Sequence, residues 1–321
     1  MCRVRRSLAI AVLHVTCRDG SKNESAGHGN IVALQRGVFQ IISNTNPKLD
    51  RLAVGQILLN SLNTHVPTMK LDAPDVVQTS SYDEIDQLQI DAVRAHARRL
   101  GRPLSILEAG CGQRWTLDLS GVEYTLTGVD LDPVALELRK TKARDLDVAI
   151  IGDLCSVELP EASFDVVFSS FVLEHVPRAD VALQNFVQWL RPGGLLILRL
   201  PERDTARGFL TRVVPHGVHV LFYRHVLGAK SAGQPGYAPY TTYYHPVIGR
   251  ARLCRFLGER GVRCLCSFGD GFRREGRGVM RLIVRGVVKL TSALSFGRLS
   301  SDYSDLLYIA MKESQTENGR R

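Results

Sequence analysis

The chain has 321 residues, a formal net charge of +9 and a hydrophobic fraction of 45%. These values fit a globular chain of one elaborated domain or two small ones. Its hydrophobic core is large enough to fold without disulfides or a structural metal. The seven cysteines, an odd number without a Cys-x-x-Cys pair, argue against a disulfide framework and against a zinc site. We therefore expect a reducing, cytoplasmic setting and no bound metal.

The first residues imitate a short signal peptide, since basic Arg3–Arg6 precede the apolar run Ser7–Val15. The small-x-small cleavage pattern is poor, so we expect the protein inside the cell and keep secretion as the alternative. From Thr16 to about Ser81 the composition is rich in Ser, Asn, Gly and Thr with little periodicity. We expect a poorly ordered extension over 1–81, a domain over 82–313 and a tail over 314–321.

The domain opens with helical spacing over Tyr82–Leu100, followed by the apolar run Leu104–Ala109 and two glycines, Gly110 and Gly112. Such a run predicts a buried parallel strand that ends in a tight turn over the start of a helix. Glycines let a backbone approach a ligand closely, and a helix start points free N–H groups at the same place. The stretch predicts a ligand cradle.

A second predicted strand, Tyr124–Asp130, ends in a carboxylate eighteen positions after Gly112. An acidic side chain at this place in a doubly wound sheet accepts hydrogen bonds from ribose hydroxyls, so the ligand should be a nucleoside. In dinucleotide enzymes a third glycine completes the pattern, but Gln113 and Arg114 stand there. This departure weakens an NAD interpretation.

Six motifs follow in order and resemble those of class I S-adenosylmethionine-dependent methyltransferases of the type 11 branch: Glu108–Gly112, Gly128–Pro133, Gly152–Leu154, Leu159–Asp165, Val172–Val176 and Arg191–Gly194. The resemblance implies an α/β fold with a doubly wound, seven-stranded, mostly parallel sheet whose last strand is antiparallel. It implies S-adenosyl-L-methionine as cofactor. The residues that would hold the cofactor are Glu108, Gly110, Gly112, Asp130, Leu131, Asp153, Leu154 and Ser170.

Later elements are expected from apolar runs and helix stops. They comprise a helix from Asp132-Pro133 to about Arg144, strands at Asp147–Ile151, Phe164–Phe168 and Leu195–Leu200, a helix from about Asp180 ended by Arg191–Gly194, a helix over Ile248–Gly261, and strands at Val262–Phe268 and Asp305–Lys312. His175, in a turn at the rim of the cleft, is the candidate general base, because histidine accepts a proton near pH 7. The alternative is that this turn only shapes the pocket.

The charge changes sign along the chain. Residues 101–200 hold nine Lys and Arg against fourteen Asp and Glu, whereas residues 201–300 hold seventeen against five. The basic half contains two insertions, 204–245 and 269–304, expected to form the acceptor pocket and lid. Aromatic residues of the first insertion either line the pocket or form a small core under a loop; they include Tyr237, Tyr240, Tyr243 and Tyr244.

The second insertion contains an amphipathic helix over 277–294, with Arg277, Arg281, Arg285 and Lys289 at every fourth position. It either lies on an anionic membrane surface or covers the active site with its charges in water. The sequence contains no nucleic-acid-binding module and no long Lys/Arg run.

Together these patterns predict a cytoplasmic enzyme, peripheral at a membrane in one interpretation, that methylates a small-molecule acceptor such as a lipid or another apolar compound. Two alternatives stay open: a cofactor-binding protein of the same fold without transferase activity, and an NAD-dependent oxidoreductase.

Overall fold

The computed structural model describes residues 73–79, 81–225, 228–234, 240–270 and 279–314. The chain divides into two compact units, residues 1–53 and 54–321, and every described residue belongs to the second. The predicted disorder of residues 1–72, the signal-like segment within it, Tyr237, and tail residues 315–321 therefore lie outside the described part.

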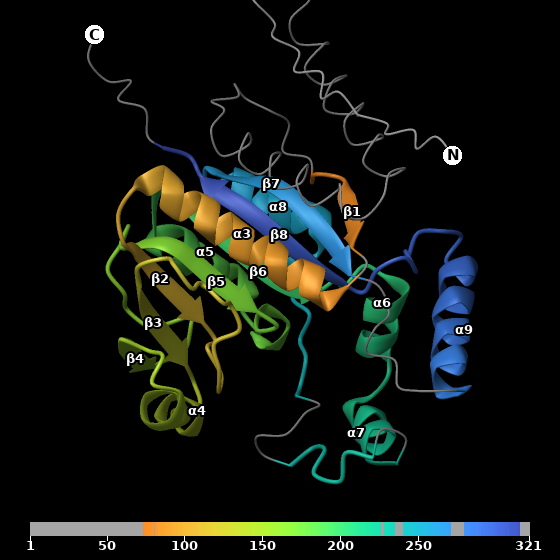
Figure 1. The fold of residues 1–321 in the computed structure, drawn as a ribbon. Helices are drawn as coiled ribbons and strands as arrows, with labels where there is room; N and C mark the ends of the chain where they lie inside the picture. The colour runs from red at the N-terminus through yellow and green to blue at the C-terminus, as the bar shows by residue number, and fades with distance from the viewer. Residues whose placement is uncertain (1–72, 80, 226–227, 235–239, 271–278, 315–321) are drawn as a thin grey trace, which may run out of the picture. The chain divides into compact units, whose positions relative to one another are not determined.

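In the described residues, eight strands form one sheet with the order β1-β7-β8-β6-β5-β2-β3-β4 (Figure 1). The strands are β1 (Val76–Thr79), β2 (Leu104–Ala109), β3 (Tyr124–Asp130), β4 (Val148–Ile151), β5 (Phe164–Ser170), β6 (Leu190–Pro201), β7 (Val262–Asp270) and β8 (Asp305–Lys312). All neighbours are parallel except β8, which runs antiparallel to both β6 and β7. From β4 to β7 this is the doubly wound sheet that the sequence predicts.

The edge strand β1 makes the sheet eight-stranded instead of seven-stranded. Val76–Thr79 pairs in parallel with Ser267–Asp270 of β7, and the Thr79 hydroxyl donates to the Gly269 carbonyl oxygen at 3.0 Å. This strand falls inside the range 1–81 that was expected to be a poorly ordered extension of the domain. Four residues with a single Val-Val pair are too short a pattern to distinguish an edge strand from a loop.

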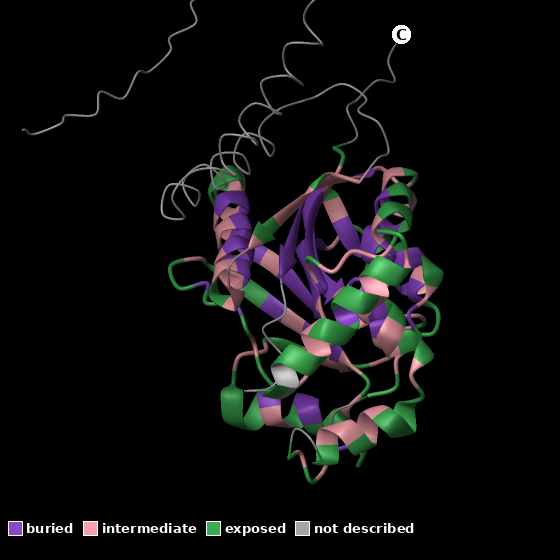
Figure 2. Cartoon of the chain, turned by 90° about the vertical axis from the view of Figure 1, so that its right-hand side faces the viewer, coloured by how far each residue is buried: buried purple, intermediate pink, exposed green. Residues whose placement is uncertain are grey.

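Helices cover both faces of the sheet and bury two apolar clusters. The helices are α3 (Tyr82–Leu100), α4 (Pro133–Leu138), α5 (Ala179–Trp189), α6 (Ala206–Val213), α7 (His216–His225), α8 (Arg250–Gly258) and α9 (Val279–Leu294). One cluster joins α5 and α8 to the sheet, and the other joins α3 to the opposite face. Figure 2 shows the buried strands between more exposed helices. Within the described part, no helix has the length and apolar character needed to cross a membrane.

Helix α3 has the bounds that the sequence predicts, because both of its ends carry capping residues. The Ser81 hydroxyl accepts a hydrogen bond from the Glu84 N–H at 3.0 Å, and Gly101 takes a left-handed φ of 63° while its N–H bonds to the Ala97 carbonyl oxygen. Ile85 and Leu88 on its inner face are buried. The helix thus starts at the edge of the sheet where the predicted cradle lies.

The helix expected after Gly112 is absent. Residues 112–123 form turns and extended segments between β2 and β3. Trp115, Leu117 and Leu119 alternate along this segment, and both leucines are buried while the Trp115 ring lies edge-on to Phe168 at 5.5 Å between centroids. An alternation with a period of two residues suits an extended chain rather than a helix. These three side chains pack in the apolar cluster that also contains the inner face of α3.

One predicted helix end differs from the structure and another agrees. The helix that begins at Pro133 ends at about Arg144 as predicted, although its last turn, Arg139–Ala143, is π-helical. Helix α5 ends at Trp189, earlier than expected, and β6 already begins at Leu190, so Arg191–Gly194 belongs to a strand. Gly193 has a φ of 74°, which a glycine can adopt within an irregular strand start.

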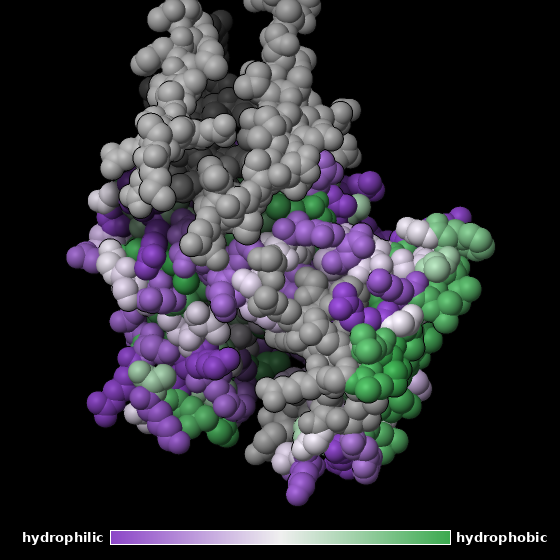
Figure 3. Space-filling view, turned by 45° about the vertical axis from the view of Figure 1, so that its right-hand side comes forward, coloured by the Kyte–Doolittle hydropathy of each residue, from purple (hydrophilic) through white to green (hydrophobic). Residues whose placement is uncertain are grey.

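Helix α9 packs against α6, and its apolar residues point away from the protein (Figure 3). Leu282, Leu290 and Leu294 are 67%, 60% and 70% exposed, whereas Val288 on the opposite side is 2% exposed. Of the predicted basic stripe, Lys289 is exposed and Arg285 is half-buried, while Arg277 and the Arg281 side chain lie outside the described part. The face that the helix presents to solvent is therefore its apolar face.

Candidate active site

A cavity of about 1020 Å³ opens at the carboxyl ends of β2, β3, β5 and β6. In open α/β sheets this edge is where ligands bind. All nine residues that the sequence singles out line this cavity: Glu108, Gly110, Gly112, Asp130, Leu131, Asp153, Leu154, Ser170 and His175. The structure thus brings them into one site, and its volume suits a nucleoside cofactor together with a small acceptor.

The turn after β2 needs both of its glycines. Gly110 and Gly112 have φ angles of 76° and 54°, in the left-handed region. A Cβ at Gly110 would overlap the Val172 side chain, which belongs to the turn after β5. At Gly112 a Cβ would meet no atom, so this glycine leaves an open face in the cavity wall. Such an exposed backbone is the cradle that a nucleoside cofactor requires.

Asp130 stands beside this turn with its carboxylate held in place. One oxygen accepts the Gly112 N–H at 2.8 Å and the other accepts the Asp132 N–H at 2.9 Å. Each carboxylate oxygen keeps further acceptor capacity, so both ribose hydroxyls could still donate to it. The neighbouring Leu131 is 68% exposed at the cavity, where it offers an apolar surface to an adenine ring.

Asp153 and Leu154 form the wall beyond β4. The Asp153 carboxylate accepts the N–H of Cys155 at 2.8 Å, which fixes the side chain in its turn. The Leu154 carbonyl oxygen accepts from the Asn185 side chain of α5 at 2.9 Å. The Leu154 side chain is buried in the core, so its backbone is the part that a ligand would meet.

Arg139, which the sequence did not single out, stabilises the glycine turn on the side away from the cavity by binding the carbonyl oxygen of Cys111. It is fully buried and donates to Glu108 at 2.8 Å, to Asp145 at 2.6 Å and to the Cys111 carbonyl oxygen at 2.8 Å. Burial raises the pKa of the Glu108 carboxyl, while the guanidinium of Arg139 opposes that rise. In sequence, Arg139 belongs to a run of basic residues that resembles an exposed helix face. No sequence signal separates it from its exposed neighbours.

An aromatic wall closes the other end of the cavity, where an acceptor would lie. The guanidinium carbon of Arg199 is 4.8 Å from the centre of the Tyr82 ring and 5.1 Å from that of Phe171. Phe171 has a φ of 57°, an uncommon conformation for a bulky residue and one that is enriched at functional sites. Arg199 also pairs with Asp86 at 2.9 Å, so its charge is balanced.

His175 lies on the same wall and contacts the first insertion. Its Nδ1 is 2.7 Å from the Thr241 carbonyl oxygen, which can only accept, so Nδ1 carries the hydrogen and Nε2 of the neutral ring is an acceptor. Burial lowers the pKa of His175 below its ordinary 6.5, although the bond to Thr241 acts in the opposite direction. Nε2 lies 3.7 Å from Glu174 Oε1. This geometry suits a base and equally suits an anchor for the insertion.

The tyrosines of the insertion 204–245 lie in different environments. Tyr240 lines the cavity, with its ring edge-on to His175 at 5.8 Å. Tyr244 is buried in the core cluster of α5 and α8, whereas Tyr243 is more than half exposed. Both alternatives for these residues thus apply, each to a different tyrosine. No described residue of 269–304 lines the cavity, so the described part of α9 forms no cover over it.

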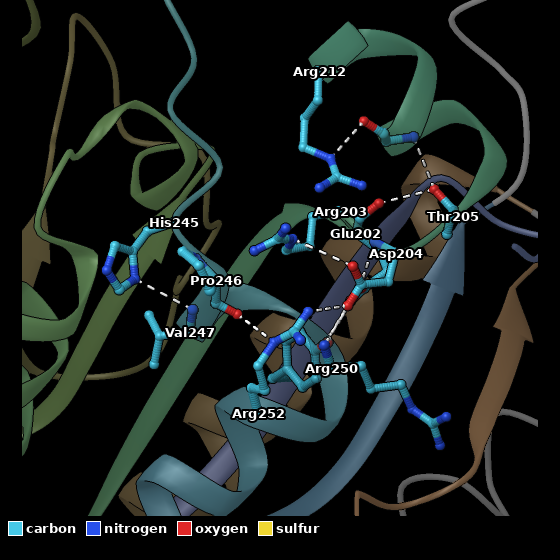
Figure 4. A network of polar contacts seen from close by, with 12 residues as sticks. Glu202, Arg203, Asp204, Thr205, Arg212, His245, Pro246, Val247, Arg250 and Arg252 are labelled. Atoms are coloured by element: carbon cyan, nitrogen blue, oxygen red, sulfur yellow. Dashed lines mark hydrogen bonds and ion pairs between the residues drawn. The ribbon is translucent and has the colours of Figure 1, made fainter. Parts of the chain in front are cut away.

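A polar network holds together the two ends of this insertion (Figure 4). The buried Glu202 carboxylate accepts the backbone N–H groups of Asp204 at 3.0 Å and Arg250 at 3.1 Å. The Arg252 guanidinium bonds to Asp204 at 2.6 Å and to the Pro246 carbonyl oxygen at 2.7 Å. The segment that leaves β6 and the segment that leads into α8 are therefore fixed side by side.

Among the described residues, no cluster of His, Cys, Asp and Glu is arranged to hold a metal.

Comparison with known proteins supports the family. Residues 107–198 match the model of a family described as a methyltransferase domain. The chain is 33% identical over 101 residues to a probable S-adenosylmethionine-dependent methyltransferase of Mycolicibacterium smegmatis, covering 31% of this chain and 39% of that protein. It is 31% identical over 150 residues to a ubiquinone biosynthesis O-methyltransferase of Nitrosococcus oceani, covering 42% of this chain and 62% of that one.

A demethylmenaquinone methyltransferase of Staphylococcus aureus is 29% identical over 161 residues, which cover 48% of this chain and 66% of the relative. The chain thus spans between two fifths and two thirds of the length of these relatives. Among solved structures, the YcgJ protein of Bacillus subtilis matches with a TM-score of 0.46 and 14% identity over 73% of this chain and all of that one. Over residues 107–198 the chain thus matches a methyltransferase domain, and the relatives that it resembles there include S-adenosylmethionine-dependent methyltransferases.

Proposed function

We propose that the protein transfers a methyl group from S-adenosyl-L-methionine to a small apolar acceptor, such as a lipid. The observation that carries this proposal is the single cavity in which a glycine cradle, a fixed carboxylate and an aromatic wall face one another. The cofactor supplies a methyl group on a sulfonium, which makes the reaction an in-line displacement. The protein's part is to align the acceptor and exclude water.

In this proposal the two ends of the cavity have separate roles. Asp130 accepts the ribose hydroxyls, Asp153 with the backbone of Leu154 holds the adenine edge, and Gly110, Gly112 and Ser170 border the amino-acid part. Because no helix start follows Gly112, the positive charge beside this part comes from Arg114, which lines the cavity. Glu108 acts through Arg139 and keeps the turn in shape.

The acceptor lies between Tyr82, Phe171 and Tyr240. Flat aromatic side chains suit a ring or another apolar group, and the relatives named above include a ubiquinone biosynthesis O-methyltransferase and a demethylmenaquinone methyltransferase. His175 is the proposed base where the acceptor is a hydroxyl, since Nε2 is the acceptor nitrogen of its neutral ring. We assign the protein to the cytoplasm and, for an acceptor that partitions into lipid, to the surface of a membrane.

The test is methyl transfer from radioactive S-adenosylmethionine to a fractionated cell extract, with extraction into organic solvent. We expect label in an apolar small-molecule fraction, and loss of that label in Asp130→Ala but not in the matched control Asp118→Ala, which changes an exposed aspartate in the segment before β3. A protein that binds adenosylhomocysteine in calorimetry but labels nothing would be a binding protein without transferase activity. Binding of NAD without adenosylhomocysteine would identify an oxidoreductase.

A further inference from the structure

The surface built by α6, α7 and α9 exposes more apolar side chains than a helix face in water should. On α9 the exposed residues include Val279, Leu282, Ile283, Val287, Leu290 and Leu294, and α6 and α7 add Val213, Val218 and Leu221. Figure 3 shows the α9 part as a continuous hydrophobic band. Large apolar patches on a protein surface mark interaction sites.

The residues of α9 segregate by face. At 100° per residue, Leu282, Leu290 and Leu294 fall on one side, while the buried Val288 and half-buried Arg285 fall on the other. The inner side packs against α6. The sixteen residues give a straight apolar stripe roughly 24 Å long, the form of a helix that lies flat in an interface.

The charge of the same segments indicates what would cover this stripe. Residues 205–234, which contain α6 and α7, hold four Lys and Arg and no Asp or Glu. Residues 276–301, which contain α9, hold five Lys and Arg and again no Asp or Glu. Lys289 is exposed and lies two helical turns after Leu282, beside the apolar stripe. A surface that joins apolar residues with cations and lacks acidic residues complements anionic lipid.

We propose that the exposed faces of α9, α6 and α7 dock this protein on an anionic membrane. The apolar stripe enters the boundary between headgroups and acyl chains, and the flanking Lys and Arg side chains contact lipid phosphates. Helix α6 begins five residues after the carboxyl end of β6, the edge of the sheet that holds the cavity. The inference does not depend on methyl transfer, because binding is measured without turnover.

The test is co-sedimentation of the full chain with vesicles of phosphatidylcholine alone or mixed with phosphatidylglycerol. We expect binding to the mixed vesicles at about 0.1 M salt, and its loss towards 1 M, where the Debye length falls to about 3 Å. The double variant Leu282→Gln/Leu290→Gln should bind at least about tenfold more weakly, since burying one leucine accounts for roughly a factor of ten or more. Its adenosylhomocysteine affinity and melting temperature should not change.

The matched control is Val148→Gln/Ile151→Gln, two equally apolar and exposed positions on β4, which should bind vesicles like the unmodified chain. The proposal is wrong if the unmodified chain stays in the supernatant at low salt, or if the α9 double variant sediments as well as the control. A chain that forms a dimer, loses it in the α9 variant and ignores vesicles would show that a second copy covers this face, which also overturns the proposal.

Discussion

The buried ion pair between Arg139 and Glu108, next to the glycine turn after β2, gives a quantitative prediction. Arg139→Met removes a fully buried guanidinium and leaves Glu108, itself 4% exposed, without its partner at 2.8 Å. Removing one partner of a buried, hydrogen-bonded pair of this kind costs about 3–5 kcal/mol. Asp145 contributes little to the loss because it is partly exposed and can be solvated. We therefore expect the free energy of unfolding at pH 7 to fall by about 3–5 kcal/mol in urea titrations.

A double-mutant cycle separates this loss from general damage. Replacing both partners, in Glu108→Met/Arg139→Met, removes the stranded carboxylate, so the double variant should lose less than the sum of the single losses by about 1–3 kcal/mol. Lys140→Met is the control, because Lys140 is the exposed neighbour in the same turn and should change stability by no more than about 0.5 kcal/mol. Additive losses, or a loss below about 1 kcal/mol in Arg139→Met, would refute the role of the pair.

Three further predictions concern single carboxylates and the histidine. Asp130→Ala should weaken adenosylhomocysteine binding at least about tenfold in calorimetry, because it removes charged hydrogen bonds worth roughly 1.5–3 kcal/mol. Unchanged affinity in a folded variant would contradict the assignment of Asp130 to the ribose hydroxyls. Because the pKa of His175 lies below 6.5, its ring is neutral at pH 7; a base there predicts a methylation rate that is flat above pH 7 and falls at lower pH. His175→Gln should abolish this acidic limb, whereas a limb that persists with a change in KM alone would identify an anchor. Burial acts to raise the pKa of Asp165, but hydrogen bonds from Arg102, Ser105 and Arg191 hold it at about 2 against its ordinary 3.8. Asp165→Asn should therefore cost about 2 kcal/mol in thermal unfolding at pH 7, and this difference should vanish as the pH falls through 2; an equal cost at both pH values would contradict it.

Much of the sheet follows from the sequence, because its central strands are buried on both faces and so appear as apolar runs with few polar interruptions. Phe164–Phe168 is the clearest case, since each of its residues is buried. The bounds of α3 follow as well, because Ser81 and Gly101 cap it. The ligand edge could be located from Gly110, Gly112 and Asp130, since residues that end neighbouring parallel strands must meet at one edge.

The errors share a physical cause: the deciding contact lies far away in sequence. The extended segment after Gly112 is fixed by Trp115 packing on Phe168 in β5, although the alternation of Trp115, Leu117 and Leu119 was a local signal that could have been used. The burial of Arg139 depends on Glu108 in another strand. Which face of α9 points to solvent depends on which of its residues pack against α6, and a helical wheel of α9 alone does not contain that information.

The antiparallel strand β8 lies between β6 and β7, yet it follows both in the chain, and Leu195 pairs with Met311 across more than a hundred residues. A ribosome therefore releases β6 and β7 with facing edges unpaired, each a template for the wrong partner, until residues 305–312 emerge. The sheet cannot close progressively from its amino-terminal side. Truncations or fusions that disturb Asp305–Lys312 should consequently reduce soluble yield far more than changes at the exposed β4 edge.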